Sequence, residues 1–204
     1  MTTELILGAA GAISAGLIVA GVVVLVVIVL VLWIVSAYNK LVALRETVRS
    51  AWAQIDVLLK RRYDLIPNLV ETVKGYATHE RGTLEAVIAA RNAAVTASSQ
   101  GNVGAVSQAE GQLQGAMRQL FAVAEAYPDL KANANFMQLQ GELGNTENQI
   151  AGQRSSYNEI VRQYNTTLMS IPTNFIAGPF GFTPQAFFEV QDPGQREAPQ
   201  VKFG

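Results

Sequence analysis

The sequence contains no cysteine and a single histidine, His79, among its 204 residues. Without cysteine the chain cannot form a disulfide, bind a metal through a thiolate or use a thiol as nucleophile. One histidine cannot supply the paired Glu-x-x-His ligands of a di-metal bundle or the two-histidine zinc motif. No glycine-rich phosphate loop or nucleophile elbow occurs either. We therefore expect a non-enzymatic protein without catalytic residues, cofactor or metal, in which His79 lies at the surface or caps a helix.

Charged residues are also scarce, at 15% of the chain, whereas about 25% is typical. None lies between Glu4 and Lys40, and the 19 residues from Leu17 to Val35 include nothing more polar than alanine, glycine and tryptophan. As a helix this run would extend roughly 28 Å, close to the hydrocarbon core of about 30 Å. The sequence therefore predicts one helix through a lipid bilayer, over residues 12–37.

The apolar run resembles a retained anchor more than a cleaved signal. A signal peptide begins with positive charge and has a shorter apolar stretch, whereas this chain begins with Glu4, although residues 35–37 imitate a cleavage site. Basic residues follow the span and none precedes it. They are Lys40, Arg45 and Arg49. Such residues stay on the cytoplasmic side and can meet anionic lipid if the helix tilts. We expect residues 1–11 outside the plasma membrane and the large domain in the cytoplasm.

Small residues recur every four positions through the first part of the span: Gly8, Ala12, Gly16 and Ala20. Such a face lets two membrane helices approach closely, which would produce a homo-oligomer. The alternative is that glycine and alanine are simply common in membrane helices.

The apolar pattern from residue 38 to residue 171 has the three- and four-residue steps of amphipathic helices. Pro67 is expected to kink or break the first helix near Leu65. Residues 98–106 are predicted to form a loop. Ser107 and Glu110 have the spacing of a capping box, which predicts that the next helix begins there. Proline ends that helix after Tyr127 and the last one after Ile171. The prediction is an all-α fold: a transmembrane helix followed by an antiparallel up-and-down bundle of about four long helices.

The tail, residues 172–204, holds five of the seven prolines and six of the eight phenylalanines, so it is expected to be irregular. Its phenylalanines either pack over the bundle, the favoured interpretation, or bind the membrane surface or a partner.

Three polar features remain. Residues 60–62 are basic, and we predict that they form a solvated face of the helix on which Asp56 pairs with Lys60. Asn158 and Asn165 each follow a tyrosine on the last helix, and we favour polar core residues that fix helix register over a ligand groove. Beyond the span the chain has 15 basic and 15 acidic residues, and this balance predicts no binding to nucleic acid.

Several ordered blocks of the sequence strongly resemble the LemA family. They are residues 38–42 (YNKLV), 51–57 (AWAQIDV), 61–70 (RRYDLIPNLV), 73–77 (VKGYA), 127–133 (YPDLKAN), 139–143 (LQGEL), 146–148 (TEN), and the YN pairs at 157–158 and 164–165. The resemblance covers about residues 38–182. It implies a bacterial-type membrane protein with a short extracytoplasmic N-terminus, one span, a cytoplasmic helical bundle and no enzymatic activity, and it transfers no catalytic or binding residues.

Three functional hypotheses follow. The first is a membrane-anchored scaffold that self-associates through its span and bundle. The second is a tethered adaptor or receptor that binds a cytoplasmic protein or peptide of unknown identity. The third is a coat protein that shapes the membrane.

Overall fold

The computed structural model describes residues 2–189, and within that range the chain forms six helices and no strand. This confirms the all-α prediction. The helices are α1 (Thr2–Lys74), α2 (Arg81–Ser99), α3 (Val103–Glu125), α4 (Pro128–Lys131), α5 (Ala134–Met169) and α6 (Asn174–Ala177). The described residues divide into two compact units. The first unit contains residues 2–45 and 166–183, and the second contains residues 46–165 and 184–189.

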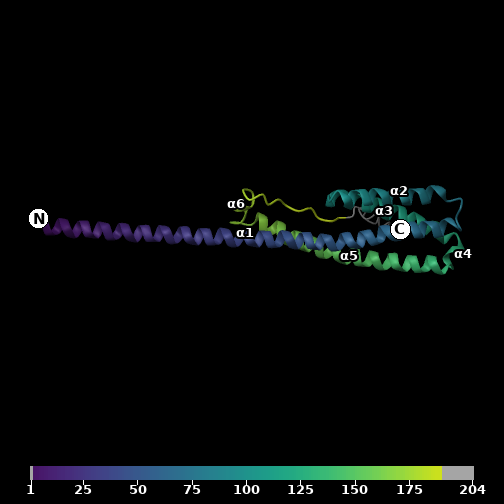
Figure 1. Ribbon diagram of the computed structural model, residues 1–204, viewed down its shortest axis with the longest axis horizontal. Coiled ribbons are helices and arrows are strands. Elements are labelled where there is room, and N and C mark those ends of the chain that lie inside the picture. The colour runs from purple at the N-terminus through teal and green to yellow at the C-terminus, as the bar shows by residue number, and fades with distance from the viewer. Residues whose placement is uncertain (1, 190–204) are drawn as a thin grey trace, which may run out of the picture. The chain divides into compact units, whose positions relative to one another are not determined.

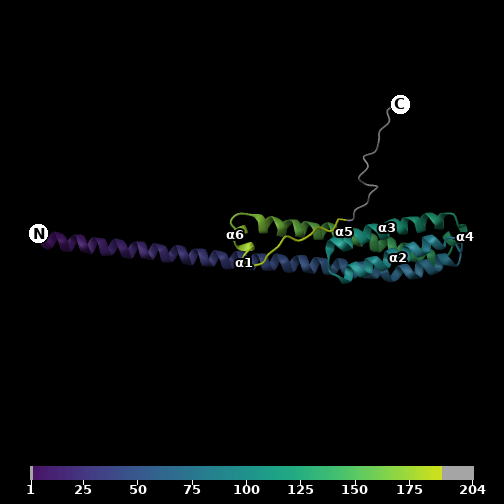
Figure 2. The ribbon, with the colours of Figure 1, turned by 90° about the horizontal axis from the view of Figure 1, so that it is seen from above.

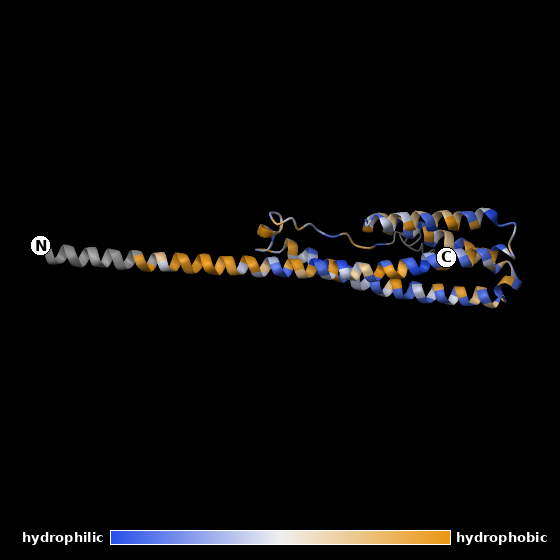
Figure 3. Ribbon diagram, in the orientation of Figure 1, coloured by the Kyte–Doolittle hydropathy of each residue, from blue (hydrophilic) through white to orange (hydrophobic). Residues whose placement is uncertain are grey.

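In the first unit, α1 carries the apolar run, and α6 lies beside α1 in both views (Figures 1 and 2). Large apolar side chains of the run are exposed, from Leu17 at 70% to Val35 at 51%, and they form the continuous orange stretch in Figure 3. Among the described residues, α1 is the one helix long and apolar enough to cross a membrane. The predicted apolar helix is therefore present, and none of the residues that the structure describes packs around its centre.

In the second unit, the later part of α1 packs with α2, α3 and α5 as a bundle (Figure 1). The buried side chains follow the predicted three- and four-residue steps. They include Val48, Ile55, Leu59, Ile66 and Val73 of α1, Leu84 and Val87 of α2, Leu113 and Leu120 of α3, and Phe136, Leu143, Ile150 and Val161 of α5. Burying such stripes against one another is what stabilises helices of this composition.

The predicted kink or break near Leu65 is wrong as a break, because α1 continues past Pro67 to Lys74. Proline has no amide hydrogen to donate to the carbonyl four residues earlier, which here belongs to Tyr63. Arg91 Nε of α2 donates to that carbonyl at 3.1 Å. The helix ends instead at Lys74, where the amides of Tyr76 and Ala77 both bond to the Val73 carbonyl.

The predicted start of α3 at Ser107 is also wrong. Asn102 is the N-cap, and its side chain accepts a hydrogen bond of 3.1 Å from the Ala105 amide. The turn before it contains Gly101, whose φ of 67° favours glycine. Asparagine caps a helix as well as serine does, so Ser107 and Glu110 lie inside α3, where both are buried.

The remaining connections match the proline signals. Pro128 occupies the first turn of α4, and the Asn133 side chain accepts from the Phe136 amide at 3.0 Å near the start of α5. The helix α5 ends at Met169, two residues before the predicted Ile171. Beyond α6, residues 182–189 form no regular element, as predicted for the tail.

Candidate functional site

Two asparagines of α5 hold the backbone of the tail segment, residues 184–189, within the second unit. The Asn165 side chain donates to the Gln185 carbonyl at 2.9 Å and accepts from the Gln185 amide at 2.9 Å. Asn158 does the same with Phe188, donating at 3.1 Å and accepting at 2.8 Å. Each side-chain amide thus bonds to both the backbone N–H and the backbone C=O of one tail residue, as a neighbouring β-strand would. We call these pairs of bonds the two amide clamps.

The spacing of the amide clamps follows from helix and strand geometry. Seven residues of α-helix rise about 10.5 Å, and three residues of extended chain rise roughly 10 Å. Asn158 and Asn165 are therefore as far apart along α5 as Phe188 and Gln185 are along the tail segment. The tail segment runs antiparallel to α5, because the later tail residue meets the earlier asparagine.

Further contacts fix the tail segment between the two clamps and beyond them. The Tyr157 hydroxyl donates to the Ala186 carbonyl at 2.9 Å, and the Ser107 hydroxyl of α3 donates to the Glu189 carbonyl. Burial raises the pKa of Tyr157 to about 12. The hydroxyl therefore stays protonated, and remains a donor, well into the alkaline range.

The ring of Phe188 anchors the tail segment in the bundle. It is fully buried and meets the Trp52 ring edge-on, with centroids 5.4 Å apart. The same tryptophan lies 5.5 Å from the Tyr157 ring. The neighbouring Phe187 is 40% exposed, as expected where side chains alternate along an extended backbone. The favoured prediction that tail phenylalanines pack on the bundle is confirmed for Phe188.

The two asparagines do not fix one helix against another, as the favoured interpretation of the sequence had it. Instead they bind an extended segment of the same chain, which is closer to the groove alternative. The seven-residue repeat of Tyr-Asn was the available signal. The sequence could not reveal the bonded partner, because the backbone groups of any segment would satisfy an asparagine equally well.

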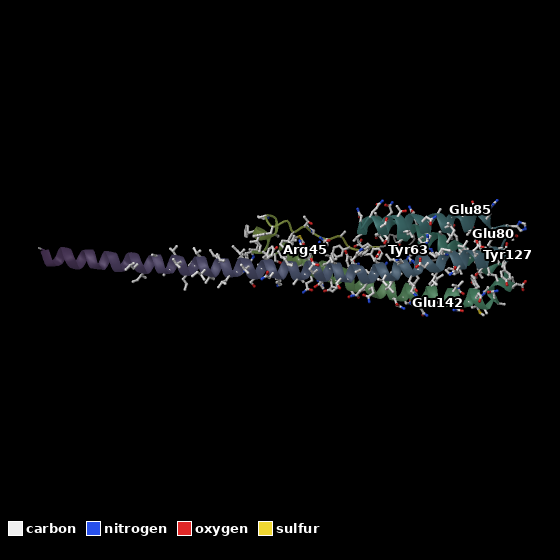
Figure 4. The ribbon with its side chains drawn as sticks, in the orientation of Figure 1. Arg45, Tyr63, Glu80, Glu85, Tyr127 and Glu142 are labelled. Carbon is white, nitrogen blue, oxygen red and sulfur yellow. The ribbon has the colours of Figure 1, made fainter. Side chains whose placement is uncertain are left out.

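An ionic cluster with a buried centre, Arg62 and Glu110, joins α1, α3 and α5 of the bundle, and its third member, Glu147, is 39% exposed. Arg62 of α1 has 1% of its side chain exposed and pairs with Glu110 of α3, which is 1% exposed, and with Glu147 of α5. The Tyr63 hydroxyl donates to Glu110 Oε1 at 2.5 Å. Burial raises the pKa of Tyr63 to about 12, against an opposing effect of Arg62. Figure 4 labels Tyr63 among these side chains.

The prediction of a solvated face at residues 60–62 is therefore wrong for Arg62, although Lys60 and Arg61 are exposed. Asp56, expected to pair with Lys60, accepts a hydrogen bond of 2.6 Å from the Ser98 hydroxyl. The sequence did contain a signal for the burial of Arg62. It is a basic residue at a position where the three- and four-residue pattern of the helix places buried side chains, and carboxylates that could pair with it occur elsewhere in the chain.

The three basic residues after the span have different surroundings. Lys40 is exposed, and Arg49 pairs with Glu46 at 2.9 Å. Arg45, labelled in Figure 4, places its guanidinium 5.0 Å from the centre of the Phe182 ring in the first unit. Their contact with anionic lipid stays a prediction.

The predicted association face of the span also stays a prediction. The side chains of Ala12 and the glycines at positions 8 and 16 lie outside the described residues, while Ala20 is exposed.

A surface groove of about 680 Å³ lies between α1 and α2. Val70, Leu84 and Ile88 are among the residues that line it. Its charged side chains pair along their own helices, Glu71 with Lys74 at 3.1 Å and Arg81 with Glu85 at 3.2 Å. Among the residues that the structure describes, no three His, Asp or Glu side chains could jointly hold a metal ion. His79 is exposed in the turn before α2.

An exposed apolar helix, a helical bundle and polar side chains that bind backbone define a membrane-associated helical-bundle protein. Within that class, the chain belongs to the LemA family, whose profile matches residues 51–203. The resemblance found in the sequence is therefore confirmed.

Known relatives agree with this assignment. Magnetosome protein MamQ 2 of Paramagnetospirillum magneticum is 23% identical over 184 residues, covering 79% of this chain and 68% of the relative. Magnetosome protein MamQ of Magnetospirillum gryphiswaldense has the same identity and coverage. Protein LemA of Metamycoplasma hominis is 25% identical over 160 residues, covering 78% of this chain and 71% of the relative. None of these names denotes an enzyme.

Proposed function

We propose that the protein is a membrane-anchored, non-enzymatic scaffold that self-associates through its span and its bundle. The anchoring rests on the continuity of α1, a single helix from Thr2 to Lys74 that supplies both the apolar run and the first helix of the bundle. The self-association rests on the small residues that recur every four positions in the span. A helix without a break ties anything bound by the bundle to the membrane. The basic residues that follow the span support an orientation with residues 1–11 outside the plasma membrane and the bundle in the cytoplasm.

The polar groups described above support binding rather than catalysis. Arg62 pairs with Glu110 and Glu147, and the amide clamps bind backbone. Catalysis would need a nucleophile, base or metal set in a cleft, with polar groups directed at a substrate. These side chains are directed at other parts of the chain instead.

Self-association through the span is tested by making its small-residue face bulky. We expect the full chain in mild detergent to form an oligomer by light scattering, and Gly16→Leu with Ala20→Leu to reduce its mass to the monomer. Ile18→Leu with Val22→Leu is the matched control, because a shift of two residues, about 200°, moves the change to the far side of the helix. A monomeric wild type, or equal masses for the two double variants, rejects association through this face.

The amide clamps favour a second candidate, a tethered adaptor that binds an extended peptide. Backbone recognition supplies affinity with little dependence on sequence, and the Phe188 site adds a preference for an aromatic side chain. A chain truncated after Thr183 should bind a labelled peptide of residues 184–189, measured by fluorescence anisotropy. Adding Asn158→Ala should weaken that binding. A truncated chain that remains folded by circular dichroism and binds no peptide excludes the adaptor.

A further inference from the structure

A long stretch of the chain around α6 carries no charge. The 26 residues from 163 to 188 contain no Asp, Glu, Lys or Arg, between Arg162 and Glu189. Outside the uncharged residues 5–39, it is the longest interval of the sequence without a charged residue; the next longest, residues 92–109, has 18. Such an interval is unusual for a surface facing water, where about a quarter to a third of the residues are charged.

This stretch also exposes large apolar side chains within the first unit. Met169 is 63% exposed, Ile171 78%, Phe175 71% and Phe180 52%. We call residues 169–180 the apolar turn. Its inner side is buried through Ile176 and Ala177, so the exposed side chains form an outer surface rather than a loosely packed core. Isolated exposed apolar residues are common, but several together mark a contact surface.

The apolar turn lies next to the point where α1 leaves its apolar run. Tyr38 follows Val35 by three residues, about 4.5 Å along the helix. The Phe180 ring lies 5.2 Å from the Tyr38 ring, and the Phe182 ring lies 5.6 Å from it. Both views show α6 beside α1 (Figures 1 and 2).

That distance corresponds to the interfacial layer of a bilayer. The hydrocarbon core is about 30 Å thick and the whole bilayer about 40–45 Å, which leaves roughly 5–7.5 Å of headgroups on each side. Tyrosine is enriched at this level, and amphipathic segments lie there with their apolar side toward the acyl chains. Hydroxyl and amide side chains such as Ser170, Thr173 and Asn174 suit the layer because they form hydrogen bonds without carrying a charge.

We propose that the apolar turn lies in the interfacial layer of the bilayer that α1 crosses, so that the protein has two membrane contacts. The occupant of this surface is lipid rather than a second protein, because Phe180, one of its exposed side chains, contacts Tyr38 just beyond the end of the span. Arg45 and Lys40 lie on α1 beyond Tyr38, toward the headgroup phosphates and the water. This inference rests on the proposed membrane anchor, and it adds a surface from the C-terminal half of the chain.

The absence of cysteine gives a direct test, because any introduced cysteine is unique. Ile171→Cys and Phe175→Cys are each labelled with a nitroxide in the full chain, in nanodiscs of phosphatidylethanolamine and phosphatidylglycerol. For each label, the rate at which the nitroxide collides with oxygen, which concentrates in lipid, is compared with the rate at which it collides with a water-soluble nickel chelate. Val26→Cys reports on the span. Val57→Cys, at a position 68% exposed in the second unit, is the aqueous control.

We expect the oxygen-to-nickel ratio at positions 171 and 175 to exceed that at position 57 several-fold and to lie below that at position 26. A ratio at 171 and 175 equal to that at 57, with 26 still in lipid, overturns the second contact and leaves the anchor. An aqueous value at 26 overturns the anchor itself. Low collision with both reagents at 171 and 175, together with dipolar broadening between labels, assigns the surface to a second copy and also overturns the proposal.

Discussion

The apolar half of α1 (residues 17–35) and its bundle half (residues 46–74) have the same backbone and opposite surroundings. In the apolar half, valine and leucine are exposed on every side, as with Val26 at 48% and Leu30 at 53%. In the bundle half, apolar side chains at three- and four-residue steps are buried, and most polar ones face outward. Both halves are helical, although the apolar half is richer in valine and isoleucine, whose helix propensity is lower.

The difference shows that one helix can be matched to two solvents by side chains alone. An apolar helix surface requires lipid, since water would have to cover it at a cost proportional to its area. A helix with one apolar stripe requires partner helices instead. The exceptions inform most: Arg62 in the bundle half is a charge at a buried step, and Pro67 is a helix breaker inside a continuous helix.

The largest expected effect comes from giving the apolar half the charges that the bundle half tolerates. Val26→Arg with Leu30→Arg should make membrane insertion less favourable by roughly 5–7 kcal/mol, because each central arginine costs about 2.5–3.5 kcal/mol. The measurement is the fraction of chain that resists alkaline extraction from membranes. Ala53→Arg with Val57→Arg is the matched control, with the same spacing at two exposed positions of the bundle half. Equal loss of membrane integration in both double variants would contradict the comparison.

Within the bundle half, removing the buried charge should have the next largest effect. Arg62→Met leaves Glu110 buried without its cation, so the free energy of unfolding should fall by about 3–5 kcal/mol. Chemical unfolding of the full chain in mild detergent, followed by circular dichroism, measures this change. Arg61→Met, one position away and exposed, should change the free energy by less than about 0.5 kcal/mol. Similar values for the two variants would show that the cluster contributes no net stability.

The amide clamps extend the comparison to α5. Asn158→Ala removes two hydrogen bonds and leaves the amide and carbonyl of Phe188 without these partners, at a cost of about 1–3 kcal/mol. The loss should appear as faster hydrogen exchange at the Phe188 amide. Asn148→Ala, an exposed asparagine of the same helix, should leave that exchange unchanged. Unchanged exchange in Asn158→Ala would show that the ring of Phe188 holds the tail segment by itself.

The sequence predicted what local periodicity determines. The apolar run, the buried stripes and the proline-defined ends of α3 and α5 depend on residues within a few turns of one another, so their spacing is visible in the chain. The start of α3 was misplaced because Asn102 and Ser107 are both good caps, and the burial of Ser107 in the bundle decides between them.

The candidate site was less predictable because its contacts join distant residues. Arg62 meets Glu110 and Glu147 only when α1, α3 and α5 assemble, so its place at a buried step of the helix does not reveal which carboxylates pair with it. The amide clamps were visible as a repeat but not as a backbone contact. The hydrogen bond to the Tyr63 carbonyl beside Pro67 likewise depends on Arg91, which lies in a different helix.

That last dependence gives the smallest and most specific prediction. Arg91→Met should cost about 1 kcal/mol, because it removes the donor from the Tyr63 carbonyl that Pro67 cannot supply. Pro67→Ala restores a backbone amide at the correct position, so Arg91→Met should cost less in that background. A double-mutant cycle by chemical unfolding should therefore give a coupling of about 1 kcal/mol. Arg91→Met could instead lower the free energy of unfolding equally with alanine and with proline at position 67. Arg91 would then stabilise the bundle in some way other than through the Tyr63 carbonyl, and the bundle half of α1 would accommodate its proline unaided.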